Sequence, residues 1–244
     1  MKLSIVVPSY RDPFLYKTLI SLLENSSDTE IIPVLDGYSE ELPRDPRIKP
    51  VVLETNKGMR GAMNAGFAVA TGDFVMKSDS HCIFAPDFDR VLTESCQENW
   101  LMIPRRYSLE DTKWERDDTR PVRDYHFYHF PEPDGRGLFV LPWGRKDREE
   151  YDIDDTMAFQ GSCWLANRKY FMEHVGVLDD RLETYGTCWG DQAEMGLKYW
   201  LNGGEIKVNK KTWYAHLKKT KRHYTNKIYG KSYKTNKLSN GQWM

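Results

Sequence analysis

Short apolar segments alternate with amphipathic segments over the first hundred residues of this 244-residue chain, and this alternation limits the folds open to it. The apolar segments are rich in β-branched residues, as buried strands are. They lie at 3–7, 30–35, 48–53, 74–77 and 101–103. Apolar residues recur at helical spacing over 14–24, 60–70 and 88–97. Because parallel strands need crossover connections, which helices usually provide, we predict an α/β fold with a mostly parallel central sheet flanked by helices.

Polar residues directly follow several of these predicted strands. They are residues 8–10 after the first strand, Asp36 at the end of the second, and residues 79–81 after the strand at 74–77. Ligands of open α/β sheets bind at the carboxyl ends of the strands. We therefore expect these residues to share one edge of the sheet and to line a binding site there.

The second half of the chain is less regular. Residues 105–155 are dense in Trp, Tyr, His, Arg and Asp and show no clean periodicity. Strands are predicted at 162–166, 206–208 and 212–215, and helices at 168–175 and 191–201. No Asp or Glu follows Glu205, whereas eleven Lys or Arg residues do. We expect a single domain over 1–217, with halves at 1–104 and 105–217, and a basic, aromatic tail at 218–244 that is either a lid or flexible.

Several classes of protein are disfavoured by the sequence. No segment approaches the roughly 18 consecutive apolar residues of a membrane span, and the apolar run before Pro8 is too short for a signal peptide, so we expect a cytoplasmic protein without a membrane span. The four cysteines form no CxxC pair, which indicates reduced thiols instead of a zinc site or disulfides. Neither GxGxxG nor GxxxxGK[ST] occurs, so dinucleotide binding and P-loop hydrolysis have no support.

Asp79 and His81 stand two residues apart after a predicted strand, so a carboxylate and an imidazole can face one cation. Oxygen plus imidazole suits a divalent ion such as Mn²⁺ better than Ca²⁺. The same residues also fit a solvated turn in which Asp79 bonds backbone amides. At this point the residues leave both interpretations open.

Four other positions have both a functional and a structural interpretation. Asp36 can accept hydrogen bonds from a ligand or form a simple turn. The loop at 56–61 leads into a helix, so its amides and basic side chains can meet an anion. Asp191 opens a helix, where the helix dipole favours acidic residues without any catalytic purpose. His216 is an isolated histidine, which is more often structural than a metal ligand.

Seven short segments nevertheless occur in an order that resembles the GT-A glycosyltransferases. From Leu3 to about Tyr224 the chain is similar to family 2 of these enzymes and to the polypeptide N-acetylgalactosaminyltransferases. The segments are Ile5-Val6-Val7-Pro8-Ser9-Tyr10, Val34-Leu35-Asp36-Gly37, Asn56-Lys57-Gly58 through Asn64-Ala65-Gly66, Ala70-Thr71-Gly72-Asp73, Ser78-Asp79-Ser80-His81, Gly161-Ser162-Cys163, and Tyr185-Gly186 through Trp189-Gly190-Asp191-Gln192-Ala193-Glu194.

The resemblance implies a GT-A fold and a role for each matching residue. Asp36 would bind the uracil base of a UDP-sugar, and Asp79, His81 and His216 would hold Mn²⁺, or Mg²⁺, against the diphosphate. The remaining positions that the resemblance assigns to the donor are Pro8, Tyr10, Lys57, Gly58, Arg60, Ser80, Trp189, Lys219 and Tyr224. It also makes 1–104 the nucleotide-binding half and 105–217 the acceptor-side half.

The resemblance gives Asp191 two possible roles. In inverting members the matching carboxylate is the general base that takes the proton of the acceptor hydroxyl, and in retaining members it has a binding role. The sequence Trp189-Gly190-Asp191-Gln192-Ala193-Glu194 is intermediate between the two groups, so Asp191 is matched as a catalytic residue with its role open. The paired carboxylate usual after the second strand is also missing, which leaves base recognition to Asp36.

The function that we expect is metal-dependent transfer of a sugar from a UDP-sugar to a hydroxyl of a saccharide or other small acceptor. The basic tail gives one alternative, the same chemistry on hydroxymethylated DNA, because its cations and aromatic residues suit a nucleic acid. Another class of alternative is a non-catalytic protein that binds nucleotide-sugars or carbohydrates. Aromatic residues between 105 and 160 either stack on sugar rings or form a small core; they are Tyr107, Trp114, Phe139 and Trp143.

Overall fold

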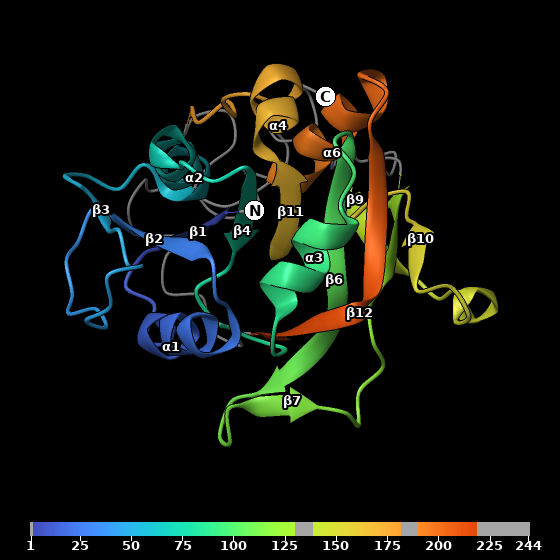
Figure 1. The fold of residues 1–244 in the computed structure, drawn as a ribbon, viewed down its shortest axis with the longest axis horizontal. Coiled ribbons are helices and arrows are strands. Elements are labelled where there is room, and N and C mark those ends of the chain that lie inside the picture. The colour runs from blue at the N-terminus through green and yellow to red at the C-terminus, as the bar shows by residue number, and fades with distance from the viewer. Residues whose placement is uncertain (1, 130–138, 182–189, 219–244) are drawn as a thin grey trace, which may run out of the picture.

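The computed structural model describes residues 2–129, 139–181 and 190–218, which form a large twisted sheet with helices packed on both of its faces (Figure 1). Four strands from the first half of the chain pair in parallel in the order β4-β1-β2-β3. Their bounds are β1 Leu3–Ser9, β2 Thr29–Asp36, β3 Val51–Leu53 and β4 Phe74–Ser78. The α/β fold predicted from the alternating pattern is confirmed in this half.

Beyond β4 the sheet becomes mixed. Strand β11 (Cys163–Asn167) is antiparallel to β4, β6 (Trp100–Glu110) is antiparallel to β11, and β12 (Glu205–Leu217) is parallel to β6. Short strands pair along β6 and β12; they are β5 (Cys82–Phe84), β7 (Glu115–Asp117) and β10 (Ile153–Asp155). The sheet is therefore parallel among its first four strands and again between β6 and β12, with the antiparallel β11 between these two groups.

Helices cover both faces of the sheet because successive residues of each strand point to opposite sides. The helices are α1 Leu15–Asn25, α2 Gly58–Val69, α3 Phe88–Ser95, α4 Arg168–His174 and α6 Asp191–Leu201, with a 3₁₀ turn at Lys146–Arg148. Ile5 of β1 packs in one core with α1 and α3, whereas Val6 packs in the other with α2, α4 and α6. None of the helices in the described ranges is long and apolar enough to cross a membrane.

The region without clean periodicity contains regular structure. Strand β6 continues to Glu110, and β8 (Tyr125–His129) pairs with β9 (Phe139–Trp143) in a separate two-stranded sheet. The two strands predicted at 206–208 and 212–215 are one strand, β12, with a register shift between Asn209 and Trp213. These strands are held by pairing with their neighbours, so their local composition does not identify them.

Two of the four aromatic residues considered for sugar stacking lie in a small cluster away from the cavity described below. Trp114 stacks on Phe14 with ring centroids 5.1 Å apart, and Tyr107 packs edge-on against Trp213 at 5.9 Å. Trp143 is 41% exposed and packs against Phe127 at 6.3 Å. The small-core interpretation therefore fits Tyr107 and Trp114.

Gly66 fixes the distance between α2 and the sheet. A Cβ atom at this position would lie 2.3 Å from Cγ1 of Val6 and 3.1 Å from Cγ2 of Val34. We expect Gly66→Ala to destabilise the fold by about 1–3 kcal/mol, although alanine favours helices, because α2 must move off the sheet. The unfolding midpoint in a thermal scan should fall by roughly 2–12 °C for a chain of this size. Val69→Ala on the exposed face of α2 is the control, and equal midpoints for both variants would contradict the expectation.

Candidate functional site

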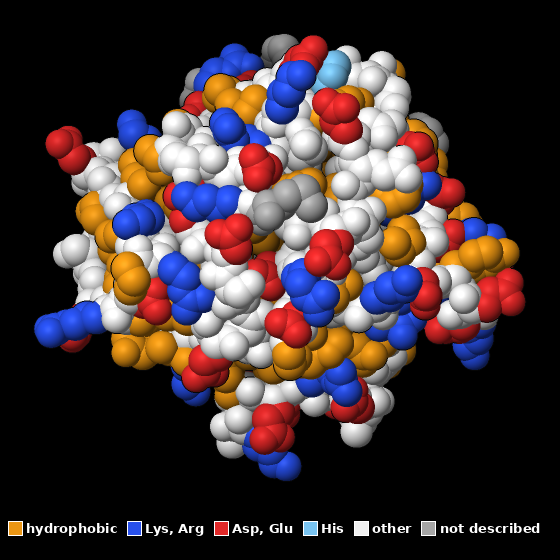
Figure 2. All heavy atoms as spheres, in the orientation of Figure 1, with side chains coloured by type: hydrophobic (Ala, Val, Ile, Leu, Met, Phe, Trp, Pro, Cys, Tyr) orange, Lys and Arg blue, Asp and Glu red, His pale blue; other side chains and the backbone are white. Residues whose placement is uncertain are grey.

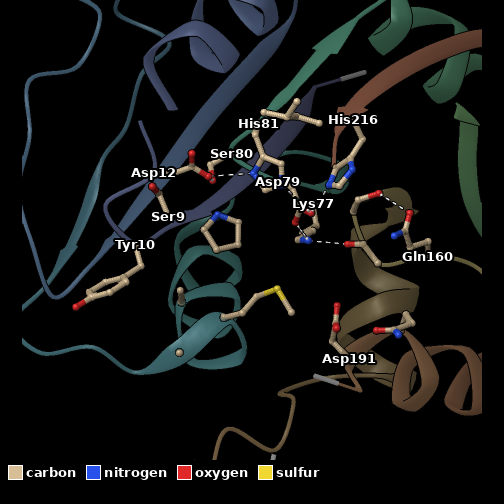
Figure 3. Close-up of a pocket in the computed structure, with 18 of the residues that line it drawn as sticks. Ser9, Tyr10, Asp12, Lys77, Asp79, Ser80, His81, Gln160, Asp191 and His216 are labelled. Atoms are coloured by element: carbon tan, nitrogen blue, oxygen red, sulfur yellow. Dashed lines mark hydrogen bonds and ion pairs between the residues drawn. The ribbon is translucent and has the colours of Figure 1, made fainter. Parts of the chain in front are cut away.

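A cavity of about 400 Å³ opens at the carboxyl ends of β1, β2 and β4, the edge predicted from the sequence (Figure 3). It is lined by residues from both halves of the chain. The lining residues that the sequence singled out are Pro8, Tyr10, Asp36, Gly58, Asp79, Ser80, His81, Asp191 and His216. Trp189, Lys219 and Tyr224 lie outside the described residues.

Asp79, His81 and His216 converge on one wall of this cavity. Nε2 of His216 lies 3.0 Å from Oδ2 of Asp79, and Nε2 of His81 lies 3.9 Å from the same oxygen. One ligand atom from each of the three residues lies within 4.8 Å of the others. The structure thus brings Asp79 and His216 together, although they are 137 residues apart in the sequence.

The pairing of β5 with β12 places His216 beside His81. Strand β5 begins at Cys82, directly after His81, and runs antiparallel to the end of β12. In this register His216 lies opposite Cys82. The two imidazole rings consequently lie with their centroids 4.7 Å apart. A strand of three residues is enough to complete the group.

Asp12 orients the imidazole of His81. Its Oδ2 lies 3.0 Å from Nδ1 of His81 and also accepts a hydrogen bond from the hydroxyl of Ser80. Because a carboxylate can only accept, Nδ1 of His81 carries the proton and the lone pair of Nε2 is left for a ligand. The sequence Asp12-Pro13 predicts Asp12 as the N-cap of the first helix, but the structure has Phe14 at that position, and Oδ1 of Asp12 accepts from the amide of Phe14 at 3.1 Å. Its contact with His81 had no local signal.

These residues fit a divalent cation. One carboxylate oxygen and two imidazole nitrogens form a donor set suited to Mn²⁺ and similar ions, and a carboxylate behind a ligating histidine is the usual outer partner. Burial lowers the pKa of His216 to about 3, although Asp79 opposes this shift, so the ring is neutral and able to ligate near pH 7. Burial alone would raise the pKa of Asp79, but Lys77 and the two histidines outweigh it and hold that pKa well below its usual value.

Lys77 lies beneath Asp79 at the end of β4. Its side chain is 1% exposed, and Nζ donates to a carboxylate oxygen of Asp79 and to the carbonyl of Gly161 at 2.6 Å. Burial disfavours its charge, but Asp79 and Asp191 together raise its pKa. The sequence analysis placed Lys77 in a strand without assigning it a role, although a lysine at the end of a buried strand is rare without a partner.

Asp191 opens α6 on the wall facing Lys77 (Figure 3). Its side chain is 2% exposed, and Oδ2 has no hydrogen-bond partner among the described residues. Gly161 leaves room for this carboxylate, since a Cβ there would lie 2.7 Å from Oδ2. Burial raises the pKa of Asp191, and Lys77 and Arg60 oppose this shift only in part. A carboxylate held in this way can take up a proton more readily than an ordinary aspartate.

Asp36 holds the loop that leads into α2. Its carboxylate accepts from the amides of Lys57 and Gly58 at 2.6 and 2.9 Å and from Nδ2 of Asn56 at 2.9 Å. Burial raises the pKa of Asp36 to about 6, and those amide hydrogen bonds oppose the shift. The two amides that the sequence offered to a ligand anion are therefore bound by Asp36. Its predicted contact with a base stays a prediction.

Two predicted donor-binding side chains are not brought to the cavity. Arg60 is 2% exposed and donates to Glu194 of α6 and to the carbonyl of Asp179 at 3.1 Å. Lys57 contributes its amide to Asp36, and neither residue is among those lining the cavity. Arg60 thus joins α2 to α6, the helix that carries Asp191. Among the cavity residues that sequence reasoning missed are Asp12, Lys77, Arg106 and Arg123.

We expect Asp12→Asn to weaken Mn²⁺ binding to the full chain by about tenfold to a hundredfold. The amide is nearly isosteric but lacks the charge that makes the imidazole of His81 a stronger ligand. Calorimetric titration of Mn²⁺ into the metal-free protein measures the change. Asp45→Asn, at a surface site paired with Arg47, is the control. Unchanged affinity in Asp12→Asn would show that His81 needs no carboxylate behind it.

The sheet with its strand-end cavity, together with a carboxylate and two histidines suited to a divalent cation, defines an α/β protein of the kind that binds a ligand through a metal ion. Residues 4–175 match the family model described as glycosyl transferase family 2. The chain belongs to this family, and its domain is that of a glycosyltransferase.

Similar proteins agree with this assignment. Human polypeptide N-acetylgalactosaminyltransferase 9 is 27% identical over 224 residues, and mouse polypeptide N-acetylgalactosaminyltransferase 3 is 27% identical over 223 residues. Each match covers 88% of this chain and 34% of the relative, so the chain spans about a third of the length of these curated relatives. A crystal structure of GalNAc-T7 with UDP, GalNAc and Mn²⁺ matches with a TM-score of 0.74 at 17% identity, covering 96% of this chain and 47% of that one. The predicted GT-A fold is confirmed.

Proposed function

We propose that this protein is a metal-dependent glycosyltransferase that moves a sugar from a UDP-sugar to a hydroxyl of a saccharide or another small acceptor. The observation that carries the proposal is the convergence of Asp79, His81 and His216 on one wall of the strand-end cavity. The proteins similar to this chain support the donor class, since GalNAc-T7 was crystallised with UDP, GalNAc and Mn²⁺.

The residues of the site have separable tasks in this reaction. A divalent ion, when bound, supplies positive charge that stabilises the departing diphosphate. Asp79, His81 and His216 bind that ion, and Asp12 orients His81. Lys77 donates a hydrogen bond to Asp79 and, by lowering its pKa, keeps this carboxylate ionised. Asp191 faces the cavity with a free acceptor oxygen, where it can take the proton of an acceptor hydroxyl or bind a sugar hydroxyl.

The test is a panel of UDP-sugars incubated with the full chain and Mn²⁺, with released UDP as the readout. Slow, Mn²⁺-dependent release from at least one donor, abolished by EDTA and restored by excess Mn²⁺, is expected, because glycosyltransferases also transfer slowly to water. UDP binding without release from any donor would favour the alternative of a non-catalytic nucleotide-sugar or carbohydrate-binding protein.

The alternative acceptor, hydroxymethylated DNA, depends on the basic tail, of which all but Lys218 lies outside the described residues. Sugar transfer to hydroxymethylated DNA, together with DNA retention at moderate salt, would support it. Absence of both would eliminate it. No observation on the described residues favours this acceptor over a small one.

A further inference from the structure

Arg106 of β6 is a buried cation in the cavity without an ionic partner. Its side chain is 7% exposed, and Nη2 donates to Nδ1 of His216 at 3.1 Å. Its buried Nε has no hydrogen-bond acceptor, and no carboxylate of the described ranges lies within ion-pair distance of it. A buried guanidinium in this state is costly unless a ligand supplies the missing anion.

Metal binding would remove the one side-chain hydrogen bond that Arg106 makes with the described residues. The proposed function requires Nε2 of His216 to bind the ion, which places the proton of the neutral imidazole on Nδ1. Protonated Nδ1 cannot accept a hydrogen bond from a guanidinium, which only donates. In the metal-loaded protein, the guanidinium of Arg106 therefore faces the cavity with its donors free.

Arg123 and Lys218 bring further positive charge to the same part of the cavity. The amide of Arg123 donates to the carbonyl of Arg106 at 3.0 Å, so the two residues lie side by side. Burial, and then the charge of Arg106, lowers the pKa of Arg123. Burial and the same two arginines lower the pKa of His126 to about 4. Neither Arg123 nor Lys218 forms an ion pair with the described residues, although carboxylates such as Asp79 and Asp191 line the same cavity.

Most of the described arginines elsewhere on this half of the protein pair with neighbouring carboxylates, whereas Arg168 donates to the carbonyl of Gly72. The pairs are Arg105–Asp124, Arg116–Asp118, Arg120–Asp117, Arg145–Asp147 and Arg148–Asp154. The face shown in Figure 2 likewise has basic and acidic side chains interspersed, without a basic stripe. Arg106 and Arg123 thus lie in the cavity without an ion pair among the described residues, which suits one anionic group on a small molecule better than a polyanion lying over the surface.

We propose that Arg106 and Arg123 form an oxyanion subsite for a phosphate or carboxylate carried by the acceptor, so that the acceptor is a phosphorylated or acidic sugar. This inference rests on the proposed function and adds the substrate class. Arg106 contacts the Nδ1 edge of His216, whereas the metal-facing atom of that ring is Nε2. The other source of such an anion is the diphosphate of the donor.

The first arm of the test measures binding of matched neutral and anionic sugars to the full chain loaded with Mn²⁺ and UDP. Calorimetry would compare glucose with glucose 6-phosphate and with glucuronate, and galactose with galacturonate. We expect at least one anionic sugar to bind about tenfold or more tightly than its neutral partner, because hydrogen bonds between charged groups discriminate by that much. Arg123→Gln and Arg106→Gln should remove the difference. Arg120→Gln, at an exposed arginine paired with Asp117, should keep it.

The second arm measures the affinity of UDP, with Mn²⁺, for the same variants. We expect it to stay within about twofold of the wild type in Arg123→Gln. A tenfold loss of UDP affinity with no discrimination between the sugars would assign the cations to the donor diphosphate and overturn the proposal. Equal affinities within every sugar pair would also overturn it. So would a result in which Arg123→Gln weakens binding of a hydroxymethylated oligonucleotide but changes the binding of none of the sugars. Failure of the wild type to bind UDP with Mn²⁺ would instead contradict the proposed function.

Discussion

Replacing His216 by alanine is expected to abolish Mn²⁺-dependent release of UDP from donor sugars, with a fall in rate on the order of a thousandfold. A bound metal ion contributes several kcal/mol to stabilising a departing diphosphate, and this variant removes one of the three residues proposed to bind it. Mn²⁺ affinity, measured by calorimetry on the metal-free chain, should fall with the rate. The fold should persist, because the side chain lies at the cavity wall.

His216→Ala is a cleaner test than Asp79→Ala, because Asp79 also forms a buried ion pair with Lys77. Asp79→Ala should also abolish turnover, but among the described residues it leaves the buried ammonium of Lys77 with the carbonyl of Gly161 as its only hydrogen-bond acceptor. Breaking a buried ion pair on one side costs about 3–5 kcal/mol, so this variant is expected to lose stability as well as activity.

The control for His216→Ala is His174→Ala, in the last turn of α4 against Tyr170. It should keep both Mn²⁺ affinity and turnover. Wild-type Mn²⁺ dependence in His216→Ala would separate this residue from the metal and remove the observation on which the proposed function depends.

The parallel half of the sheet could be predicted because its strands and helices are encoded locally. Each strand is apolar on both faces and each helix has its own apolar stripe, so a pattern over ten residues identifies them. Direction and pairing are not local properties. The antiparallel course of β11 depends on contacts with β4 and β6, and the strand at Arg105–Glu110 exists because β12 and β7 pair with it on either side.

The site divides in the same way. Asp79 and His81 follow the same strand, so their proximity could be predicted from the sequence. His216 was connected to them only through the family resemblance. Pairing of β5 with β12 is the physical cause of that contact. The sequence offers Asp12 a local role just before the first helix, so its hydrogen bond to His81 could not be predicted from it.

Lys77 and Arg106 show what sequence reasoning could have used. A lysine that closes an apolar strand must find an anion when that strand is buried, and Asp79 two residues later was the available partner. Arg106 gave no such signal, because no pattern predicted that β6 would continue beyond residue 103. A charge in an unrecognised strand cannot be placed on either face of it.

Replacing Asp191 by asparagine is expected to cut sugar transfer by on the order of a hundredfold or more while leaving UDP affinity nearly unchanged. The amide keeps the shape that packs against Gly161, so α6 and the cavity wall should stay in place. It cannot accept a proton, which is the property that the unpartnered Oδ2 offers to an acceptor hydroxyl. Comparing kcat for transfer with the dissociation constant of UDP, both with Mn²⁺, separates the two effects.

The stability of Asp191→Asn tests the same carboxylate without any substrate. Because burial raises the pKa of Asp191, the folded state favours the protonated form, so ionisation opposes folding once the pH rises above the pKa of the unfolded chain, near 4, and increasingly up to the folded pKa. The variant should therefore unfold at a higher temperature than the wild type at pH 8, and the difference should disappear below about pH 4.

The pH profile of transfer distinguishes a base from a binding residue at position 191. If Asp191 takes the proton, kcat falls as the pH drops through its raised pKa. The residual kcat of Asp191→Asn then shows no such fall at low pH. If it only binds a sugar hydroxyl, the variant raises KM and keeps the wild-type pH profile of kcat. Full activity in Asp191→Asn would remove this residue from the catalytic group and leave the metal ligands as the only described residues with a direct part in the reaction.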